Sequence, residues 1–369
     1  MADVIIENEA PAPVIQAQPP AVADIEPWFK AHREELDTNH NGRVEVAELF
    51  ETVSNKKFTS HDAGMVIGML YGFELIDGQD KKDSGISEKD VQAMSKKLKD
   101  DPNGDLAEKL KLAMLIAGSR TDNINQKLWG EFKKPVDAIK SDAVGQGSVG
   151  DCWFLGSVAA VADTMPETIA RMIREEPDGK FTVTFPGAPK YPVTVDAPTA
   201  MEMALFARSD KHGSWVAVLE KAAAQLFNRN SPYPAKHDIA ALHGGDCGVA
   251  LSLLTGEQYA RLDPTDRNFR QKLEVTAQWG LPMCAGSKPI NTDKDMDERG
   301  VFFTHLYTAK YDPRDRQVSV RNPWGWSPGG NSEPVTPDGQ PRDGVPDGAF
   351  KLSVADFQKS FPSVWVVVP

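Results

Sequence analysis

The stretch Gln146-Gly147-Ser148-Val149-Gly150-Asp151-Cys152-Trp153-Phe154-Leu155 decides the fold of this chain. Its glycines allow the backbone to turn tightly and to approach a substrate closely, and the apolar residues after Cys152 predict a buried helix. A thiol on the first turn of a helix lies at the positive end of the helix dipole, so we expect its pKa to fall. Because the thiolate is the reactive form, the stretch predicts that Cys152 is a nucleophile. The Gln146 amide is placed to help bind an oxyanion.

A cysteine nucleophile needs a base and a group that orients the base, and a second region supplies both. Residues 301–308 and 317–322 are rich in β-branched and aromatic residues and predict two strands. The sequence Asp312-Pro313-Arg314-Asp315 between them predicts a turn. A symmetric hairpin about the Pro313–Arg314 bond pairs His305 directly with Asn322. We expect Trp324 to cover this contact and keep water away.

These motifs resemble the protease core of the calpain family of papain-like cysteine proteases. The resemblance spans roughly residues 120–369 and also rests on residues 195–198, 207–209, 219–222 and 347–350. It implies an α+β fold, a two-lobed papain-like calpain protease core with its substrate cleft between the lobes. It further implies that Cys152 is the nucleophile, His305 the general base and acid, Asn322 the orienting residue and Gln146 the oxyanion donor.

A separate signal lies in residues 37–48, which fit the twelve-residue loop of an EF-hand. Gly42 stands at position 6, where the loop turns sharply, and Val44 is apolar at position 8. The sequence therefore predicts one calcium ion, held by side-chain oxygens at positions 1, 3, 5, 9 and 12 and by the position 7 carbonyl. These ligands are Asp37, Asn39, Asn41, Glu45, Glu48 and, through its carbonyl, Arg43.

A partner hand is expected to follow, because a single helix-loop-helix unit buries little apolar surface alone. Residues 61–76 and 87–98 predict its helices. The loop between them has Gln79 at position 1 and Lys81 at position 3, so an ammonium group would point toward the cation. We expect this degenerate loop to pack against the first and bind no ion. The core is thus preceded by an α-helical EF-hand domain.

The domain organisation follows from these motifs. We predict five segments: residues 1–24 as a disordered tail, 25–100 as the EF-hand pair, 101–121 as a connecting helix, 122–240 as the lobe with the nucleophile and 241–369 as the lobe with His305 and Asn322.

The composition of the chain limits the kinds of molecule that we expect it to bind. The chain has 53 acidic and 41 basic residues, and its net charge of −12 argues against nucleic acid and anionic membranes. No apolar run reaches the roughly 18 residues of a membrane span, and the start lacks a Sec signal pattern. Three widely spaced cysteines form no disulfide framework, so we expect a reducing, cytoplasmic location. Non-Sec export and the oligomeric state stay open. We expect packing roles for Cys247, at a helix start, and Cys284.

The predicted function is a calpain-like cysteine endopeptidase that cleaves protein substrates and is linked to calcium through the EF-hand. One alternative is a calcium-binding interaction protein with an inert protease core. Another is a cysteine-dependent acyltransferase of transglutaminase type. That class uses a carboxylate as its third residue, so Asn322 favours the protease.

The resemblance also implies calcium sites within both lobes of the core, but here the chain departs from the family. Glu220 matches one family carboxylate, whereas Ala143 and Ala349 stand where the family has others, and residues 326–330 are changed. Because calcium needs 6–8 oxygen ligands and anionic charge, we expect these losses to weaken both sites. We predict that the core needs no calcium switch of its own and is either constitutively assembled or controlled through the N-terminal hand.

Overall fold

The computed structural model describes residues 21–78, 85–121, 124–231, 238–290, 295–325, 333–336 and 341–368. Most of the predicted tail at 1–24, the centre of the second loop and the changed segment at 326–330 lie outside the described residues. Among the residues that are described, no helix combines the length and apolarity needed to cross a membrane.

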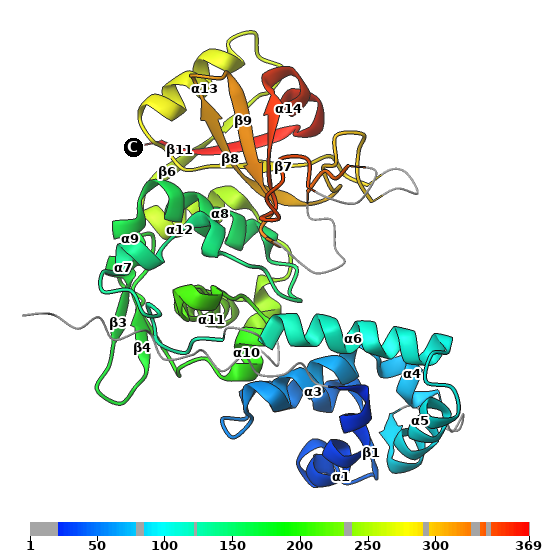
Figure 1. Ribbon diagram of the computed structural model, residues 1–369. Helices are drawn as coiled ribbons and strands as arrows, with labels where there is room; N and C mark the ends of the chain where they lie inside the picture. The colour runs from blue at the N-terminus through cyan, green and yellow to red at the C-terminus, as the bar shows by residue number, and fades with distance from the viewer. Residues whose placement is uncertain are drawn as a thin grey trace, which may run out of the picture.

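Residues 21–121, which we call the N-terminal module, are helices packed around an apolar cluster (Figure 1). The helix predicted over 61–76 is observed as two helices that meet at Gly72. A side chain added at Gly72 would collide with Leu110, which lies in the last helix of this module. The helices are α1 (Ile25–Leu36), α2 (Val46–Glu51), α3 (Ser60–Tyr71), α4 (Phe73–Asp77), α5 (Glu88–Asp100) and α6 (Asp105–Thr121).

Two short strands join the two helix-loop-helix units of this module. Strand β1 (Arg43–Val44) pairs antiparallel with β2 (Ile86–Ser87), so that Val44 lies opposite Ile86. Both of these side chains are fully buried in the apolar cluster. The loop predicted to bind calcium and the loop predicted to be degenerate are therefore neighbours.

The nucleophile stretch leads into α8 (Cys152–Thr164), in which every residue from Trp153 to Ala162 is buried. Cys247 begins a neighbouring helix and is fully buried, as predicted. We call the elements that pack around α8 in one apolar cluster the helical lobe. Its other elements are α9 (Pro166–Met172), α11 (Trp215–Arg229), α12 (Cys247–Thr255) and the antiparallel strands β3 (Ile173–Glu175), β4 (Phe181–Val183) and β5 (Val193–Val195).

Residues 258–368 contain the sheet lobe, a six-stranded antiparallel sheet with α13 (Phe269–Gln278) and α14 (Val354–Ser360) packed against it (Figure 1). Cys284 lies in this sheet and is buried, as predicted. The strand order is β10-β9-β8-β7-β11-β6, with β6 (Gln258–Leu262), β7 (Met283–Gly286), β8 (Leu306–Asp312), β9 (Gln317–Arg321), β10 (Ala349–Ser353) and β11 (Ser363–Val368).

Strands β8 and β9 form the predicted hairpin, but in a different register. Asp312 pairs with Gln317 and Thr308 with Arg321, so residues 313–316 make a four-residue turn. Arg316 adopts a left-handed φ of 58° in this turn, and the longer turn shifts the pairing by two residues. The prediction that His305 and Asn322 are paired across the strands is therefore wrong. His305 lies just before β8 and Asn322 just after β9.

Candidate active site

Cys152 is the first residue of α8 and lies beside the start of β8. A backbone hydrogen bond from Leu306 reaches its thiol. One turn further along α8, the Thr308 hydroxyl donates to the carbonyl of Gly156 at 2.7 Å. Cys152 is half-buried, whereas Cys247 and Cys284 are fully buried. The predicted nucleophile is thus the accessible thiol among the three, and it lies next to the strand that follows His305.

The protonation of Cys152 differs from our expectation. The pKa of the thiol is raised to about 11, chiefly by burial; the hydrogen bond from Leu306 opposes this rise, and the neighbouring Asp151 adds to it. The loss of water around the sulfur therefore outweighs the favourable position at the helix start. In this conformation the thiol is protonated at neutral pH, and the predicted low pKa is corrected.

The His305 ring is held by Asn322 beneath an aromatic cover. Nε2 of His305 lies 2.8 Å from Oδ1 of Asn322, and both residues are buried. The Trp324 ring lies 4.5 Å from the imidazole, centroid to centroid, and its backbone N–H donates to the same Asn322 oxygen at 3.0 Å. Trp324 thus covers the contact as expected. Since Asn322 Oδ1 accepts the Nε2 proton, the neutral ring keeps Nδ1 free to accept another.

The thiol and the imidazole are both uncharged in this structure. Burial lowers the pKa of His305 to about 4, and the hydrogen bond to Asn322 compensates only in part. Among the described residues no hydrogen bond joins the Cys152 thiol to the His305 ring. The structure therefore holds a neutral thiol near a neutral, oriented imidazole.

Gln146 is buried and links the nucleophile loop to the segment that holds the base. Its backbone N–H donates to the Pro323 carbonyl, next to Asn322, at 2.7 Å. Its side-chain Nε2 donates to the Val149 carbonyl at 2.6 Å, within its own loop. The predicted oxyanion donor is therefore beside the nucleophile, with its amide N–H engaged by the loop in this conformation.

A buried pair of acidic residues stands behind the nucleophile, and the sequence alone did not reveal it. Asp151, the residue before Cys152, is fully buried, and its carboxyl lies within hydrogen-bonding range of Glu220 on α11. Glu220 Oε2 accepts the Ala207 N–H at 3.0 Å. No donor among the described residues completes a hydrogen bond to Glu220 Oε1 or to either Asp151 carboxyl oxygen. Two such carboxylates are unfavourable when both are charged and no cation is near, so we expect the pair to share a proton.

Burial governs the ionisation of this pair. It is the main reason that the pKa of Asp151 is raised to about 7 and that the pKa of Glu220 is raised as well; contact with Asp151 raises the Glu220 pKa further, whereas contact with Glu220 lowers that of Asp151 in part. Glu202, which forms an ion pair with Lys221 at 2.7 Å, lies close enough to the pair to raise the pKa of Glu220 further. Glu220, which the family resemblance identified as a calcium ligand, here contacts a second acid and a backbone amide.

Loop 37–48 has its predicted ligands linked to one another and to the loop backbone. Gly42 turns the chain with φ of 86°, and its N–H donates to Asp37 Oδ2 at 2.8 Å. The side-chain amides of Asn39 and Asn41 donate to the Glu45 carboxylate at 3.1 and 2.7 Å. Residues at positions 1, 3, 5 and 9 of the loop therefore surround one small region.

Glu48, at position 12, closes the same loop. It is buried, and its carboxylate accepts the backbone N–H groups of Asn39 and Glu45, each at 3.0 Å. The pKa of Glu45 is lowered, first through its hydrogen-bonded contact with Glu48 and then through Asn41. A carboxylate kept ionised on an oxygen-rich loop suits a hard cation such as Ca²⁺.

The sheet lobe contains a second group of acids that the sequence did not indicate. Ligand oxygens of Glu333, Asp343 and Asp347 all lie within 4.8 Å of one another. Sequence reasoning examined Ala349 and residues 326–330 in this region and missed Glu333 and Asp343, because a Gly- and Pro-rich stretch separates them. Arg321 is buried near these acids, and its Nη2 donates to the Asp142 carbonyl at 3.2 Å.

A cavity of about 870 Å³ adjoins the nucleophile loop. Ser148 and Val149 of that loop form one wall, and Phe50 and Val53 of the N-terminal module form another. His243, from the helical lobe, completes it. The N-terminal module therefore shares a cavity with the residues that precede Cys152.

Known proteins resemble this chain over the region just described. A family model described as "Calpain family cysteine protease" matches residues 108–367. The calpain-type cysteine protease DEK1 of Arabidopsis thaliana is 31% identical over 289 residues, which cover 69% of this chain and 13% of that protein. Calpain clp-1 of Caenorhabditis elegans is 28% identical over 250 residues, covering 58% of this chain and 30% of that protein. The chain thus spans less than a third of either relative. With the family model matching most of its length, the chain belongs to the calpain family of cysteine proteases.

Proposed function

We propose that this protein is a cysteine endopeptidase in which Cys152 attacks the peptide bond and His305 transfers the protons. The observation that carries the proposal is the buried 2.8 Å contact between His305 Nε2 and Asn322 Oδ1, beneath Trp324 and beside the helix that begins with Cys152. A nucleophile at a helix start, a base, and an amide that orients the base are the three parts this chemistry requires.

The protonation states favour general-base catalysis over a preformed ion pair. As the sulfur attacks the carbonyl carbon, the thiol proton passes to Nδ1 of His305, and the imidazolium then gives it to the leaving amine. Water next attacks the thioester, giving its proton to the imidazole, and the carboxylic acid product leaves as the thiol is restored. The Asn322 carbonyl keeps the ring in the tautomer whose Nδ1 accepts. The Cys152 N–H and, after release from Val149, the Gln146 amide stabilise the oxyanion.

Two cysteines in matched sequence contexts allow a controlled test. Cys152 and Cys247 both follow Gly-Asp and both begin a helix. We expect Cys152→Ala to lose cleavage of unfolded casein and labelling by a cysteine-directed epoxide, while Cys247→Ala keeps both. Circular dichroism would show that each variant folds. Casein cleavage by folded Cys152→Ala at the wild-type rate would refute the assignment, and amine incorporation without cleavage would indicate an acyltransferase.

We also propose that residues 25–100 are a pair of EF-hands and that the first binds one calcium ion. Support comes from the linked side chains of loop 37–48, from the left-handed Gly42, and from the β1–β2 pairing at Val44 and Ile86. The ion would be held by carboxylate and amide side-chain oxygens and one carbonyl. These ligands are Asp37, Asn39, Asn41, the Arg43 carbonyl, Glu45 and Glu48. When bound, the ion would add positive charge and rigidity to the loop.

The physiological setting follows from the same chemistry. Three free thiols, one of them the nucleophile, need a reducing compartment, and we propose the cytoplasm. The cavity beside Ser148 and Val149 is the surface on which we expect part of a protein substrate to bind.

A further inference from the structure

We propose that the helix α10 (Ala200–Leu205) positions the nucleophile loop and that the N-terminal module holds α10 in place. The inference rests on the proposed role of Cys152. It adds Thr199 and α10 as positioning elements, and it makes the N-terminal module part of the support of the active site. Figure 1 shows α10 between α11 of the helical lobe and α3 of the N-terminal module.

The side chains of α10 complete the core of the N-terminal module. Ala200, Met201, Ala204 and Leu205 are buried in the same apolar cluster as residues of α3 and α6. In the chain these four residues lie about 50 positions after Cys152, within the predicted lobe of the nucleophile. This short helix therefore belongs to the protease core in sequence but packs in the core of the N-terminal module.

The start of α10 is bonded directly to the module. Thr199 is the N-cap residue of α10, and its hydroxyl donates to the Val53 carbonyl at 2.6 Å while accepting the Glu202 N–H at 3.1 Å. Val53 lies in the 3-10 helix that follows α2, five residues after Glu48 of the predicted calcium loop. Apart from this buried contact, Lys56 lies 3.3 Å from Asp196, an exposed ion pair that contributes little.

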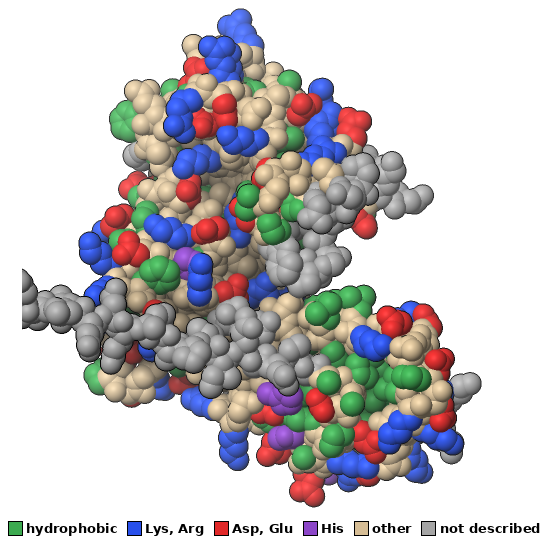
Figure 2. Space-filling view, viewed as in Figure 1, with side chains coloured by type: hydrophobic (Ala, Val, Ile, Leu, Met, Phe, Trp, Pro, Cys, Tyr) green, Lys and Arg blue, Asp and Glu red, His purple; other side chains and the backbone are tan. Residues whose placement is uncertain are grey.

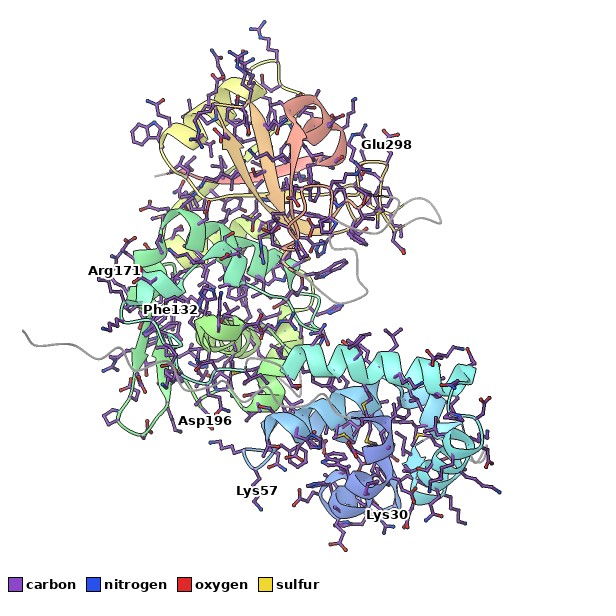
Figure 3. All side chains as sticks on the ribbon, in the orientation of Figure 1. Lys30, Lys57, Phe132, Arg171, Asp196 and Glu298 are labelled. Carbon is purple, nitrogen blue, oxygen red and sulfur yellow. The ribbon has the colours of Figure 1, made fainter. Side chains whose placement is uncertain are left out.

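Figure 3 shows where this junction lies, with Asp196 on the helical lobe and Lys57 on the module on either side of it. In Figure 2, hydrophobic side chains gather on the visible face of the N-terminal module between charged ones.

The end of α10 is bonded to the nucleophile loop. The Leu205 carbonyl accepts the Ser148 N–H at 2.8 Å, and Gly145 and Arg208 exchange two backbone hydrogen bonds, each at 2.9 Å. Gly147 lies so close that an added Cβ would be 2.2 Å from the Phe206 carbonyl oxygen and 2.3 Å from that of Leu205. The backbone of residues 145–148 thus follows the backbone of residues 205–208, with no side chain between them at Gly147.

The same loop carries the proposed nucleophile and oxyanion donor and is bonded to the segment that holds Asn322. It ends at Cys152, and its Gln146 N–H holds the Pro323 carbonyl next to Asn322. A shift of α10 would therefore move the oxyanion donor and the nucleophile relative to His305. Misplacement of reacting groups by about 1 Å is enough to reduce rates about a hundredfold. Through α10, a change in the N-terminal module would therefore alter the positions of Cys152 and Gln146.

The test removes the Thr199 hydroxyl and restores it. In the full-length protein, we expect Thr199→Val to lower kcat/KM on a peptide substrate about fivefold to tenfold, the effect of one buried hydrogen bond. The loss should fall mainly in kcat, because the nucleophile is misplaced while substrate binding is kept. Hydrogen exchange at the Ser148 amide should become faster. Thr199→Ser, which keeps the hydroxyl, should restore both readouts.

Thr276→Val is the matched control, since Thr276 is a buried threonine in α13 whose hydroxyl also donates to a backbone carbonyl, that of Lys272 at 2.9 Å. It should lower the melting temperature comparably with no change in kcat. If Thr199→Val lowers the melting temperature yet keeps wild-type kcat and Ser148 exchange, Thr199 is merely structural and the inference is wrong. Failure of wild-type protein to react with the epoxide at Cys152 would instead refute the proposed function.

Discussion

Loop 37–48 and the Asp151–Glu220 pair both place carboxyl groups side by side, but the two places differ in burial and in hydrogen-bond donors. In the loop, the Glu45 and Glu48 carboxylates accept hydrogen bonds from amides, and the pKa of Glu45 is lowered, first through its contact with Glu48 and then through Asn41. In the core, Glu220 accepts one hydrogen bond, from Ala207, no donor among the described residues completes a hydrogen bond to the Asp151 carboxyl, and burial raises the pKa of both acids. Glu45 is surrounded by hydrogen-bond partners, whereas burial with few donors raises the pKa of Asp151 and Glu220.

The two places also differ in what the sequence predicted for calcium. Loop 37–48 has several oxygen-bearing side chains around one region. In the helical lobe, Ala143 stands where the family resemblance implies a ligand, and Glu220 lies within hydrogen-bonding range of Asp151. That the core needs no calcium of its own stays a prediction.

The largest expected effect concerns calcium in the loop. We expect Glu48→Gln in the full-length protein to weaken calcium binding more than about tenfold, because position 12 supplies the bidentate carboxylate. Glu35→Gln, an exposed change on α1 just before the loop, should leave the affinity unchanged. Titration calorimetry measures both, and Asp343→Asn shows whether the acids of the sheet lobe contribute heat. Unaltered heat in Glu48→Gln would mean that the loop is not the site.

The second effect is the pH dependence of stability. The folded pKa of Asp151, about 7, lies above its ordinary value near 4, so between these values the folded state binds more protons than the unfolded state. The contribution of Asp151 to the free energy of unfolding is fully present below about pH 4 and is lost as pH rises through about 7. Each unit between the folded and unfolded pKa values corresponds to about 1.4 kcal/mol.

Glu220→Gln should flatten that dependence, since its amide can accept from Ala207 and donate to an ionised Asp151. The melting temperature would then fall less between pH 5 and pH 8 than in the wild type. Asp163→Asn, in an exposed ion pair with Lys310, is the control and should follow the wild-type slope. Parallel curves for Glu220→Gln and wild type would show that no shared proton exists.

The smallest effect concerns the thiol. Because its pKa is about 11, alkylation of Cys152 by uncharged iodoacetamide should keep rising above pH 9. Asp151→Asn removes a negative neighbour and should shift this profile to lower pH by less than about one unit, since burial is the larger cause. Stopped-flow labelling, with the product mapped to Cys152, gives the profile. A plateau near pH 7 in the wild type would indicate a preformed ion pair instead.

Several features could be predicted because they depend on neighbours in the chain. The helix after Cys152, the hairpin of β8 and β9, and the arrangement of residues 37–48 follow from local spacing, glycine positions and apolar periodicity. The packing positions of Cys247 and Cys284 followed from the same reasoning. Pattern recognition also paired His305 with Asn322, although through the wrong register.

The pairing register of β8 and β9 could not be predicted from the local sequence. A left-handed Arg316 lengthens the turn, and no residue in the turn sequence demands that conformation. The side chains still meet, at 2.8 Å, because both segments continue past the ends of their strands. Their contact is a property of the sheet and of Trp324 above it.

The sequence by itself determined the family, the nucleophile candidate and the calcium-loop candidate, since each is a short motif whose chemistry depends on residue types at fixed spacing. Only the tertiary structure decided the protonation of Cys152, the partnership of Asp151 with Glu220 and the sharing of α10 with the N-terminal module. These depend on desolvation and on contacts between residues about 70 to 150 positions apart. The physical reason is that burial is set by whichever distant segments cover a group, and no local pattern specifies them.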